Sequence, residues 1–176
     1  MPLVIDFADI FKAHFEYVWH SLRRLGVQER DLEDVTHDVF VTVHPRLPAY
    51  DASRPLRPWL FAFACRAASD YRRQARHRVA LTDDPDALRD PAPAVDEQAA
   101  SRQELERVAR ALETLELDRR PVFILHEIDD VSIPEIALAL GIPTNTAYSR
   151  LRLGREQFAV AMRRGELRRV PTGGQP

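Results

Sequence analysis

The stretch that decides the fold is "SIPEIALALGIPTNTAYSRLRLGREQF", residues 132–158. Ser132 precedes an apolar run and Glu135 follows three residues later, which is the spacing of a capping box at the start of a short helix. Gly141 favours the end of that helix, because glycine readily adopts the left-handed conformation found just past helix ends. Ile142 then provides an apolar side chain that can pack inside the turn, and a second helix follows. This order predicts a helix-turn-helix.

The second helix of this pattern has two distinct faces. Thr144 can cap it, and we expect it to run to about Phe158. On a helical wheel its apolar side consists of Ala147, Leu151, Gly154 and Phe158. The opposite, polar side consists of Asn145, Ser149, Arg152 and Glu156, with Tyr148 and Arg155 beside it. Asparagine, serine and arginine can bind base edges in a major groove, and flanking arginines can hold phosphates. An αα-hairpin with a solvated face would show the same two sides, so the cap and the turn are needed to favour DNA binding.

Apolar residues recur at helical spacing in the N-terminal half as well. Three stripes predict three amphipathic helices: Phe7, Phe11, Phe15, Val18, Leu22 and Leu25; Leu32, Val35, Val39 and Val43; and Leu60, Ala64, Ala67 and Tyr71. Gly26 ends the first helix, and Asp31 can cap the second. Pro45 and Pro48 interrupt the pattern after the second helix, and we expect the third to span about Pro58 to His77.

Residues 81–101 lose this periodicity and concentrate proline and aspartate, which predicts a flexible acidic linker. Beyond it, Leu105, Val108, Ala109, Leu112 and Leu115 indicate another helix, and Pro121 suits the first turn of the next. The fold class is therefore all-α, with two small helical domains. We expect domains at 1–79 and 102–165, a linker at 80–101 and a disordered tail at 166–176.

Composition narrows the class of protein. The chain has 176 residues, 45% of them hydrophobic and 30% charged, and contains no apolar run long enough to span a membrane. We therefore expect a cytoplasmic protein without membrane insertion. Lys12 is the only lysine, so nearly every cation is arginine, which suits contacts with phosphate and guanine but also follows from GC-rich codons. The single Cys65 permits no intrachain disulfide, and we expect it to be buried.

The motifs together resemble a known family. "DLEDVTHDVFVTV" and "RPWLFAFACRAASDYRRQAR" in the first half, with "LETLELDRRPVFILHEIDDVSIPEIALALGIPTNTAYSRLRLGRE" in the second, are similar to the extracytoplasmic-function sigma factors of bacterial RNA polymerase. The resemblance covers nearly the whole chain in the right order. It implies an alternative sigma factor that binds core RNA polymerase and promoter DNA, has no enzymatic activity or cofactor, and is held by a probable anti-sigma factor.

The resemblance also implies roles for particular residues. The helix matching "DLEDVTHDVF" would bind the polymerase through Glu33, Asp34, Thr36, His37 and Asp38, although these residues could equally form an ordinary solvent-exposed side of the helix. The next helix would read the minus-ten element as a single strand, using Trp59, Phe61, Arg66, Arg73 and Arg76; Trp59 and Phe61 could equally be core residues. The loop between these helices would capture a flipped-out base with Tyr50, Arg54 and Arg57. The minus-thirty-five contacts would be Thr144, Asn145, Tyr148, Ser149, Arg150, Arg152 and Arg155.

Some positions depart from the family pattern. Ala67 stands where asparagine is common, and Ala147 and Tyr148 stand where a larger aliphatic residue and a lysine are common. These departures affect the promoter sequence that is read rather than the class. A stand-alone helix-turn-helix repressor or activator stays open as an alternative, as does a helical adaptor that never touches DNA. Asp34, His37, Asp38 and His44 lack the spacing of a metal site, so we expect no metal and no catalytic residues.

Overall fold

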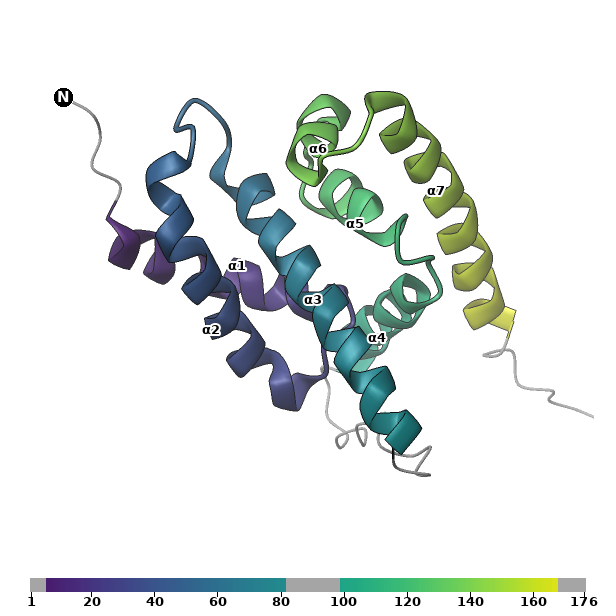
Figure 1. The fold of residues 1–176 in the computed structure, drawn as a ribbon. Coiled ribbons are helices and arrows are strands. Elements are labelled where there is room, and N and C mark those ends of the chain that lie inside the picture. The colour runs from purple at the N-terminus through teal and green to yellow at the C-terminus, as the bar shows by residue number, and fades with distance from the viewer. Residues whose placement is uncertain (1–5, 82–98, 168–176) are drawn as a thin grey trace, which may run out of the picture. The chain divides into compact units, whose positions relative to one another are not determined.

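The computed structural model describes the backbone of residues 6–81 and 99–167, and the side chains of 6–77 and 103–165 (Figure 1). All regular elements of these residues are helical, which confirms the predicted all-α class. They form two compact units, one containing α1 to α3 and the other containing α4, α5, most of α6, and α7. None of these helices combines the length and the apolar character needed to cross a membrane.

The first unit is a three-helix bundle. It consists of α1 (Phe7–Arg24), α2 (Leu32–Val43) and α3 (Leu56–Leu81), each of which contacts the other two. Short 3₁₀ segments, η1 (Glu29–Asp31) and η2 (His44–Ala49), lie between them. The α-helix α2 ends at Val43, just before Pro45, and Pro48 lies within η2, so the two prolines interrupt the helix as predicted.

The predicted apolar stripes form the core of this bundle. Its fully buried side chains include Val18, Leu22, Leu25, Leu32, Val39, Phe40, Val43, Leu60, Phe61 and Ala64. Phe11 and Phe15 are half-buried, and their rings lie 4.9 and 6.3 Å from the ring of Phe40. The helical spacing of apolar residues therefore identified the packed faces of all three helices.

Asp31 has a different role from the one expected. It precedes α2, but its carboxylate makes no capping hydrogen bond. Instead it accepts a 2.6 Å hydrogen bond from the Tyr71 hydroxyl on α3. Burial and this bond raise the pKa of Tyr71 to about 12. The prediction of a cap at Asp31 is wrong because a tertiary partner takes its side chain, whereas Asp6 does cap α1 by accepting from the Ala8 amide at 3.1 Å.

The second unit consists of α4 (Ala99–Glu113), α5 (Arg120–Phe123), α6 (Ile133–Leu140) and α7 (Thr144–Leu167). A π-helical turn, η3 (Ile124–Ile128), continues α5. Pro121 lies in the first turn of α5, as predicted. Leu112 and Leu115 are buried as their stripe indicates, but Leu105 is 69% exposed.

The helix-turn-helix has the predicted turn. Gly141 has φ +66° and ends α6, and the Ile142 amide donates to the Ala137 carbonyl at 2.9 Å. Half of the capping box is present, since the Glu135 carboxylate accepts from the Ser132 amide at 3.2 Å and from its hydroxyl at 2.6 Å. Thr144 is the first residue of α7 rather than a residue before it.

α7 continues nine residues beyond the predicted end at Phe158, because its second half packs along α4. Gly165 lies there, where an added Cβ would be 3.5 Å from Arg107 Cγ. The predicted linker 80–101 overlaps the ends of α3 and α4, and the predicted tail 166–176 overlaps the end of α7. The rest of both, 82–98 and 168–176, lies outside the described residues.

Candidate nucleic-acid and protein interfaces

The apolar side of α7 anchors the helix in the second unit. Ala147 and Leu151 are 0% and 4% exposed. A Cβ on Gly154 would lie 3.6 Å from Phe123, and the Phe158 ring lies 4.8 Å from the Phe123 ring. The predicted buried side of this helix is therefore confirmed, and its other side is turned outward.

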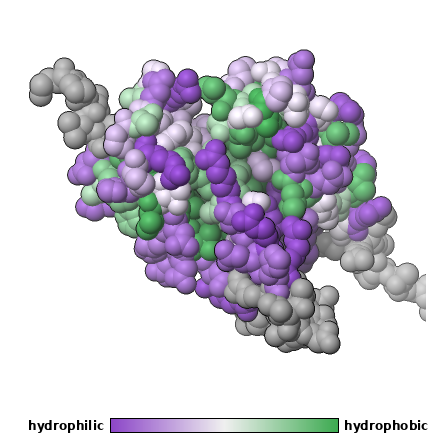
Figure 2. Space-filling view, in the orientation of Figure 1, coloured by the Kyte–Doolittle hydropathy of each residue, from purple (hydrophilic) through white to green (hydrophobic). Residues whose placement is uncertain are grey.

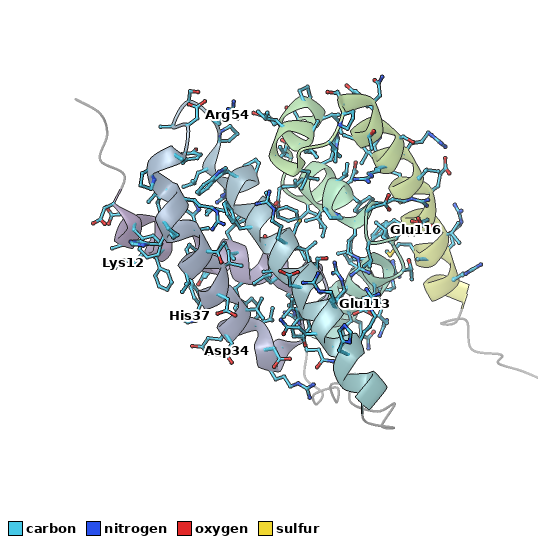
Figure 3. All side chains as sticks on the ribbon, in the orientation of Figure 1. Lys12, Asp34, His37, Arg54, Glu113 and Glu116 are labelled. Atoms are coloured by element: carbon cyan, nitrogen blue, oxygen red, sulfur yellow. The ribbon has the colours of Figure 1, made fainter. Side chains whose placement is uncertain are left out.

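Two interactions besides this packing fix the orientation of α7. Gln157 donates from its amide to the Glu116 carboxylate at 3.2 Å and accepts from the Glu116 backbone amide at 3.4 Å. Glu116 lies in the turn after α4, where Figure 3 shows it near Glu113. These hydrogen bonds link α7 to the turn after α4 in addition to the apolar packing.

The outward side carries the predicted minus-thirty-five residues. Six of them are exposed: Thr144, Asn145, Tyr148, Ser149, Arg152 and Arg155. Arg150 is half-buried. The structure therefore brings all seven to one helix, with Asn145, Ser149 and Arg152 at helical spacing along it.

Each arginine on this side has a carboxylate partner. Arg150 Nε lies 3.2 Å from Asp118, and Arg152 Nη1 lies 2.7 Å from Glu156. Arg155 donates from Nε and Nη2 to a single oxygen of Glu127, at 2.9 and 2.6 Å. Sequence analysis placed Arg152 and Glu156 on one side of the helix but missed the other two pairs, since Asp118 and Glu127 are more than twenty residues away from their partners along the chain.

The π-helical turn places Glu127 at this site. The Asp129 amide donates to the Ile124 carbonyl at 3.1 Å, which widens the turn by one residue, and Asp130 then adopts φ 54°. Such turns interrupt regular helices and are frequent at functional sites. Here the turn brings Glu127 next to α7, where it also lies 3.1 Å from His126 Nδ1.

In the first unit, aromatic rings connect the loop after η2 with α3. Trp59 lies between Tyr50 and Phe63, with both ring centroids 4.8 Å away. Both Tyr50 and Trp59 are half-buried and so keep accessible surface. Arg54 lies at the tip of the loop (Figure 3), paired with Asp51 at 3.1 Å. Its carbonyl accepts from the Tyr50 hydroxyl.

This loop is ordered by Asp51. Its carboxylate accepts from the Ser53 amide and hydroxyl at 3.0 and 2.7 Å. These two bonds are the largest cause of a lowered pKa of Asp51. The carboxylate thus stays ionised to lower pH than an ordinary aspartate and keeps both hydrogen bonds to Ser53 there.

A groove of about 350 Å³ lies beside these rings, between α2 and α3. Arg66, one of the predicted residues, and Arg46 both line it, with their guanidinium carbons 5.5 and 5.9 Å from the Phe63 ring centroid. Sequence analysis missed both Arg46, which lies outside the quoted motifs, and Phe63, which lies inside one but was not singled out. Asp38 and Asp70 line the groove as well, and Phe63 is only 7% exposed. The contribution of this groove to nucleic-acid binding would therefore come from its two exposed guanidinium groups.

The other predicted minus-ten residues are more dispersed. Phe61 is 0% exposed, which favours its interpretation as a core residue. Arg57 lies over the Tyr17 ring of α1 at 5.2 Å. Arg73, paired with Asp70 at 2.9 Å, and Arg76 are exposed further along α3. Of the predicted minus-ten residues, the structure therefore places Arg66 in the groove, and Tyr50 and Trp59 in the ring cluster that ends at Phe63.

The exposed side of α2 is acidic. Glu33, Asp34, His37 and Asp38 are exposed, and Figure 3 shows Asp34 and His37 projecting outward from the helix. Thr36 is fully buried and donates to the Leu32 carbonyl at 2.6 Å, so it does not belong to this surface.

One apolar residue joins this surface. Val41 is 71% exposed and lies three and four residues after Asp38 and His37, on the same side of α2. In Figure 2 hydrophilic side chains predominate over the lower ends of α2 and α3, with hydrophobic side chains in small areas among them. A charged surface with one exposed aliphatic residue is suited to a protein partner.

Family models match both units. Residues 10–78 match Sigma-70 region 2, and residues 105–158 match Sigma-70, region 4. The sigma factor NccH of Alcaligenes xylosoxydans xylosoxydans is 28% identical over 165 residues, which cover 92% of this chain and 89% of NccH. CnrH of Cupriavidus metallidurans is 29% identical over 164 residues, covering 89% and 86% of the two chains. The extracytoplasmic-function (ECF) sigma factor SigW of Bacillus subtilis is 24% identical over 180 residues, covering 89% of each.

Two solved structures are similar over most of their length. CnrH in complex with the cytosolic domain of CnrY is 28% identical, with a TM-score of 0.65 and coverage of 89% of this chain and 87% of CnrH. The sigma factor RpoE of Bartonella quintana, in complex with the anti-sigma factor NepR, has a TM-score of 0.68 and covers 91% and 98%, at 20% identity. This second likeness is one of fold.

Proposed function

The chain belongs to the sigma-70 family of RNA polymerase sigma factors, and we propose that its two units divide promoter recognition between them. It is an alternative sigma factor of the extracytoplasmic-function group, which directs transcription initiation. Sigma factors are not themselves enzymes. Its work on core polymerase and promoter DNA would take place in the cytoplasm.

The outward side of α7 is the observation that carries the proposal. Asn145, Ser149 and Arg152 are exposed along one line of a helix whose opposite side is buried in a helix-turn-helix. The second helix of this motif enters the major groove, where such side chains bind base edges. Arg152 would read a base of the minus-thirty-five element, and Arg150 and Arg155 would hold phosphates. Thr144 and Tyr148 lie beside them.

The first unit would bind the opened minus-ten strand. Tyr50 and Trp59 offer rings for stacking, and the groove beside Phe63 offers two guanidinium groups, from Arg46 and Arg66. Arg54 and Arg57 would contact the strand near the loop, and Arg73 and Arg76 further along α3. We leave Phe61 out of this site because it has no accessible surface.

The acidic side of α2 would bind core polymerase. Glu33, Asp34, His37 and Asp38 provide the charge, and Val41 adds an apolar contact that the sequence did not indicate. Charged surfaces of this kind set the orientation and rate of association. Val41 would add affinity when a partner covers it. A probable anti-sigma factor is a further partner, since the relative CnrH forms a complex with the cytosolic domain of CnrY.

Run-off transcription with core RNA polymerase, on the promoter upstream of the chain's own gene, tests the proposal. The wild-type chain should start transcription at a defined position. Arg152→Ala should lose about 5- to 150-fold in promoter preference, equivalent to the 1–3 kcal/mol of one base contact, at one position of the minus-thirty-five element. Arg163→Ala is the matched control, because Arg163 is exposed on α7 beyond the recognition residues.

The same assay separates the sigma factor from a stand-alone repressor or activator. Transcription that does not depend on adding the chain to core polymerase contradicts the proposal. Equal loss on all promoter variants after Arg152→Ala contradicts only the assignment of Arg152 to base reading.

A further inference from the structure

The recognition surface of α7 is close to electrically neutral, although its sequence is basic. Its three arginines, Arg150, Arg152 and Arg155, are each within 3.2 Å of a carboxylate. The partners come from three places: Asp118 from the turn before α5, Glu127 from the π-helical turn, and Glu156 from α7 itself. These pairs have a direct consequence for binding DNA.

Binding to DNA without regard to sequence is driven by cations that replace the counterions of phosphates. An arginine that already faces a carboxylate contributes little to this term, because the carboxylate repels the same phosphate that the guanidinium attracts. The pairs are exposed enough to be exchanged: the side chains of Arg155 and Arg152 are 54% and 64% exposed. A phosphate or base edge in the right position can therefore still displace or share them.

The geometry at Arg155 shows how sharing works. Glu127 uses the Nε and Nη2 donors of the guanidinium through one oxygen. A guanidinium has five N–H donors, so its Nη1 edge is left for a second acceptor. Glu127 thus holds the Arg155 guanidinium in one orientation, and its negative charge offsets the positive charge of that guanidinium.

We propose that Asp118, Glu127 and Glu156 act as specificity-determining residues, by suppressing sequence-independent attraction of α7 to DNA phosphates. Their carboxylates repel DNA phosphates, so contacts with the phosphate backbone alone add little affinity. A duplex then binds tightly only if its bases match the side chains of α7. The proposal rests on the proposed function, in that it takes α7 as the helix that binds duplex DNA.

The test uses the full chain and a labelled short duplex of random sequence, with binding followed by fluorescence anisotropy over a range of salt concentrations. Glu127→Gln keeps the shape of the side chain and removes its charge. It should bind the random duplex about two- to fivefold more tightly, since exposed ion pairs are of this strength. The slope of log affinity against log salt should steepen by up to about 0.9, the value for one additional phosphate contact. Asp118→Asn and Glu156→Gln should act in the same direction.

Glu106→Gln is the matched control. Glu106 pairs with Arg110 at 3.8 Å in the same unit, and both residues belong to α4 rather than to α7. It should leave both the affinity and the slope unchanged. The double variant Glu127→Gln with Arg155→Gln should lose the gain of the single variant, which assigns the effect to this pair. Thermal unfolding should show that all variants remain folded.

Unchanged or weaker binding of random duplex by all three single variants overturns the proposal. Weaker binding would assign Glu127 to positioning Arg155 instead. An equal gain in Glu106→Gln would also overturn it, because the effect would then follow overall charge. Run-off transcription with the wild-type chain tests the proposed function separately. If the wild-type chain starts transcription but the variants bind random duplex as the wild type does, only this further proposal fails. If the wild-type chain does not start transcription, the proposed function fails whatever the variants do.

Discussion

Cys65 shows at the scale of one residue how surroundings set chemistry. Burial raises the pKa of its thiol, and the charges of Arg72 and Arg66 oppose this only in part. The thiol therefore stays protonated in the folded chain at pH values where an exposed thiol ionises. Because only the unfolded chain loses this proton there, the free energy of unfolding should fall as the pH rises above the pKa of an exposed thiol. We expect iodoacetamide to alkylate Cys65 at least tenfold more slowly at pH 8.5 in the folded chain than in urea, measured by mass spectrometry. Cys65 is half-buried rather than fully buried as the sequence predicted. Equal rates in the two conditions would show that its surroundings do not shield the thiol.

The limits of sequence analysis are clearest at this scale. Phe61 and Phe63 lie two residues apart on α3, and spacing alone does not tell what each side chain contacts. Both are buried, at 0% and 7% exposed, but Phe63 packs against Trp59 and lies near the guanidinium groups of Arg46 and Arg66. Asp31 likewise matched a capping position but bonds to Tyr71, forty residues away. Such choices depend on tertiary partners, which a local pattern does not contain.

At the scale of elements, one arginine in each unit donates hydrogen bonds to carbonyls at the end of the first helix; Arg72 is half-buried and Arg120 is buried. Arg72 donates to the Leu25 carbonyl at 2.6 Å, after α1. Arg120, which is 5% exposed, donates to the Glu113 carbonyl at 2.6 Å and to the Leu115 carbonyl at 3.4 Å, after α4. The last carbonyls of a helix lack partners within it, and these side chains supply them.

Replacing Arg120 should therefore destabilise the second unit. Arg120→Met keeps most of the buried volume but leaves these carbonyls without donors, which should lower the free energy of unfolding by about 1–3 kcal/mol in urea titration. Arg110→Met is the control, since the Arg110 side chain is 68% exposed, and should change it by less than about 0.5 kcal/mol. A similar effect of the two substitutions would show that the hydrogen bonds at the end of α4 are unimportant.

Helix type was more predictable than helix length. The period of apolar residues identified the buried sides of α1, α2 and α7, because a packed face must recur every three to four residues. α7 continues past Phe158 and packs along α4, where Gly165 lies next to Arg107, a contact between residues far apart in sequence. The π-helical turn at Ile124–Ile128 was also missed, and with it the position of Glu127 beside Arg155.

At the scale of the whole molecule, each unit has its own core, and each proposed DNA surface is small. The composition of residues 80–101 predicts a flexible connection between them, and this prediction lies largely outside the described residues. A flexible segment of about twenty residues has a relaxed span of roughly 25 Å and can stretch to about 70 Å. Such a connection would not by itself set the spacing needed for two promoter elements.

The isolated chain should consequently bind promoter duplex weakly and with little sequence preference at physiological salt. Each unit alone makes a small, salt-sensitive contact, and tethering adds affinity only when geometry lets both units bind at once. Core polymerase would fix that geometry and help to expose the minus-ten strand. Anisotropy with a promoter duplex should therefore show specific binding only after core polymerase is added, and permanganate footprinting should then show open DNA. Tight, specific binding of duplex by the isolated chain, unaffected by polymerase, would instead favour a stand-alone repressor.

The variant Asp34→Lys with Asp38→Lys should lose the specific binding that core polymerase confers, because both residues are exposed on the side of α2 assigned to polymerase. It should keep its thermal stability, since surface substitutions change stability little. Full response of the lysine variant to polymerase would remove the acidic side of α2 from the interface.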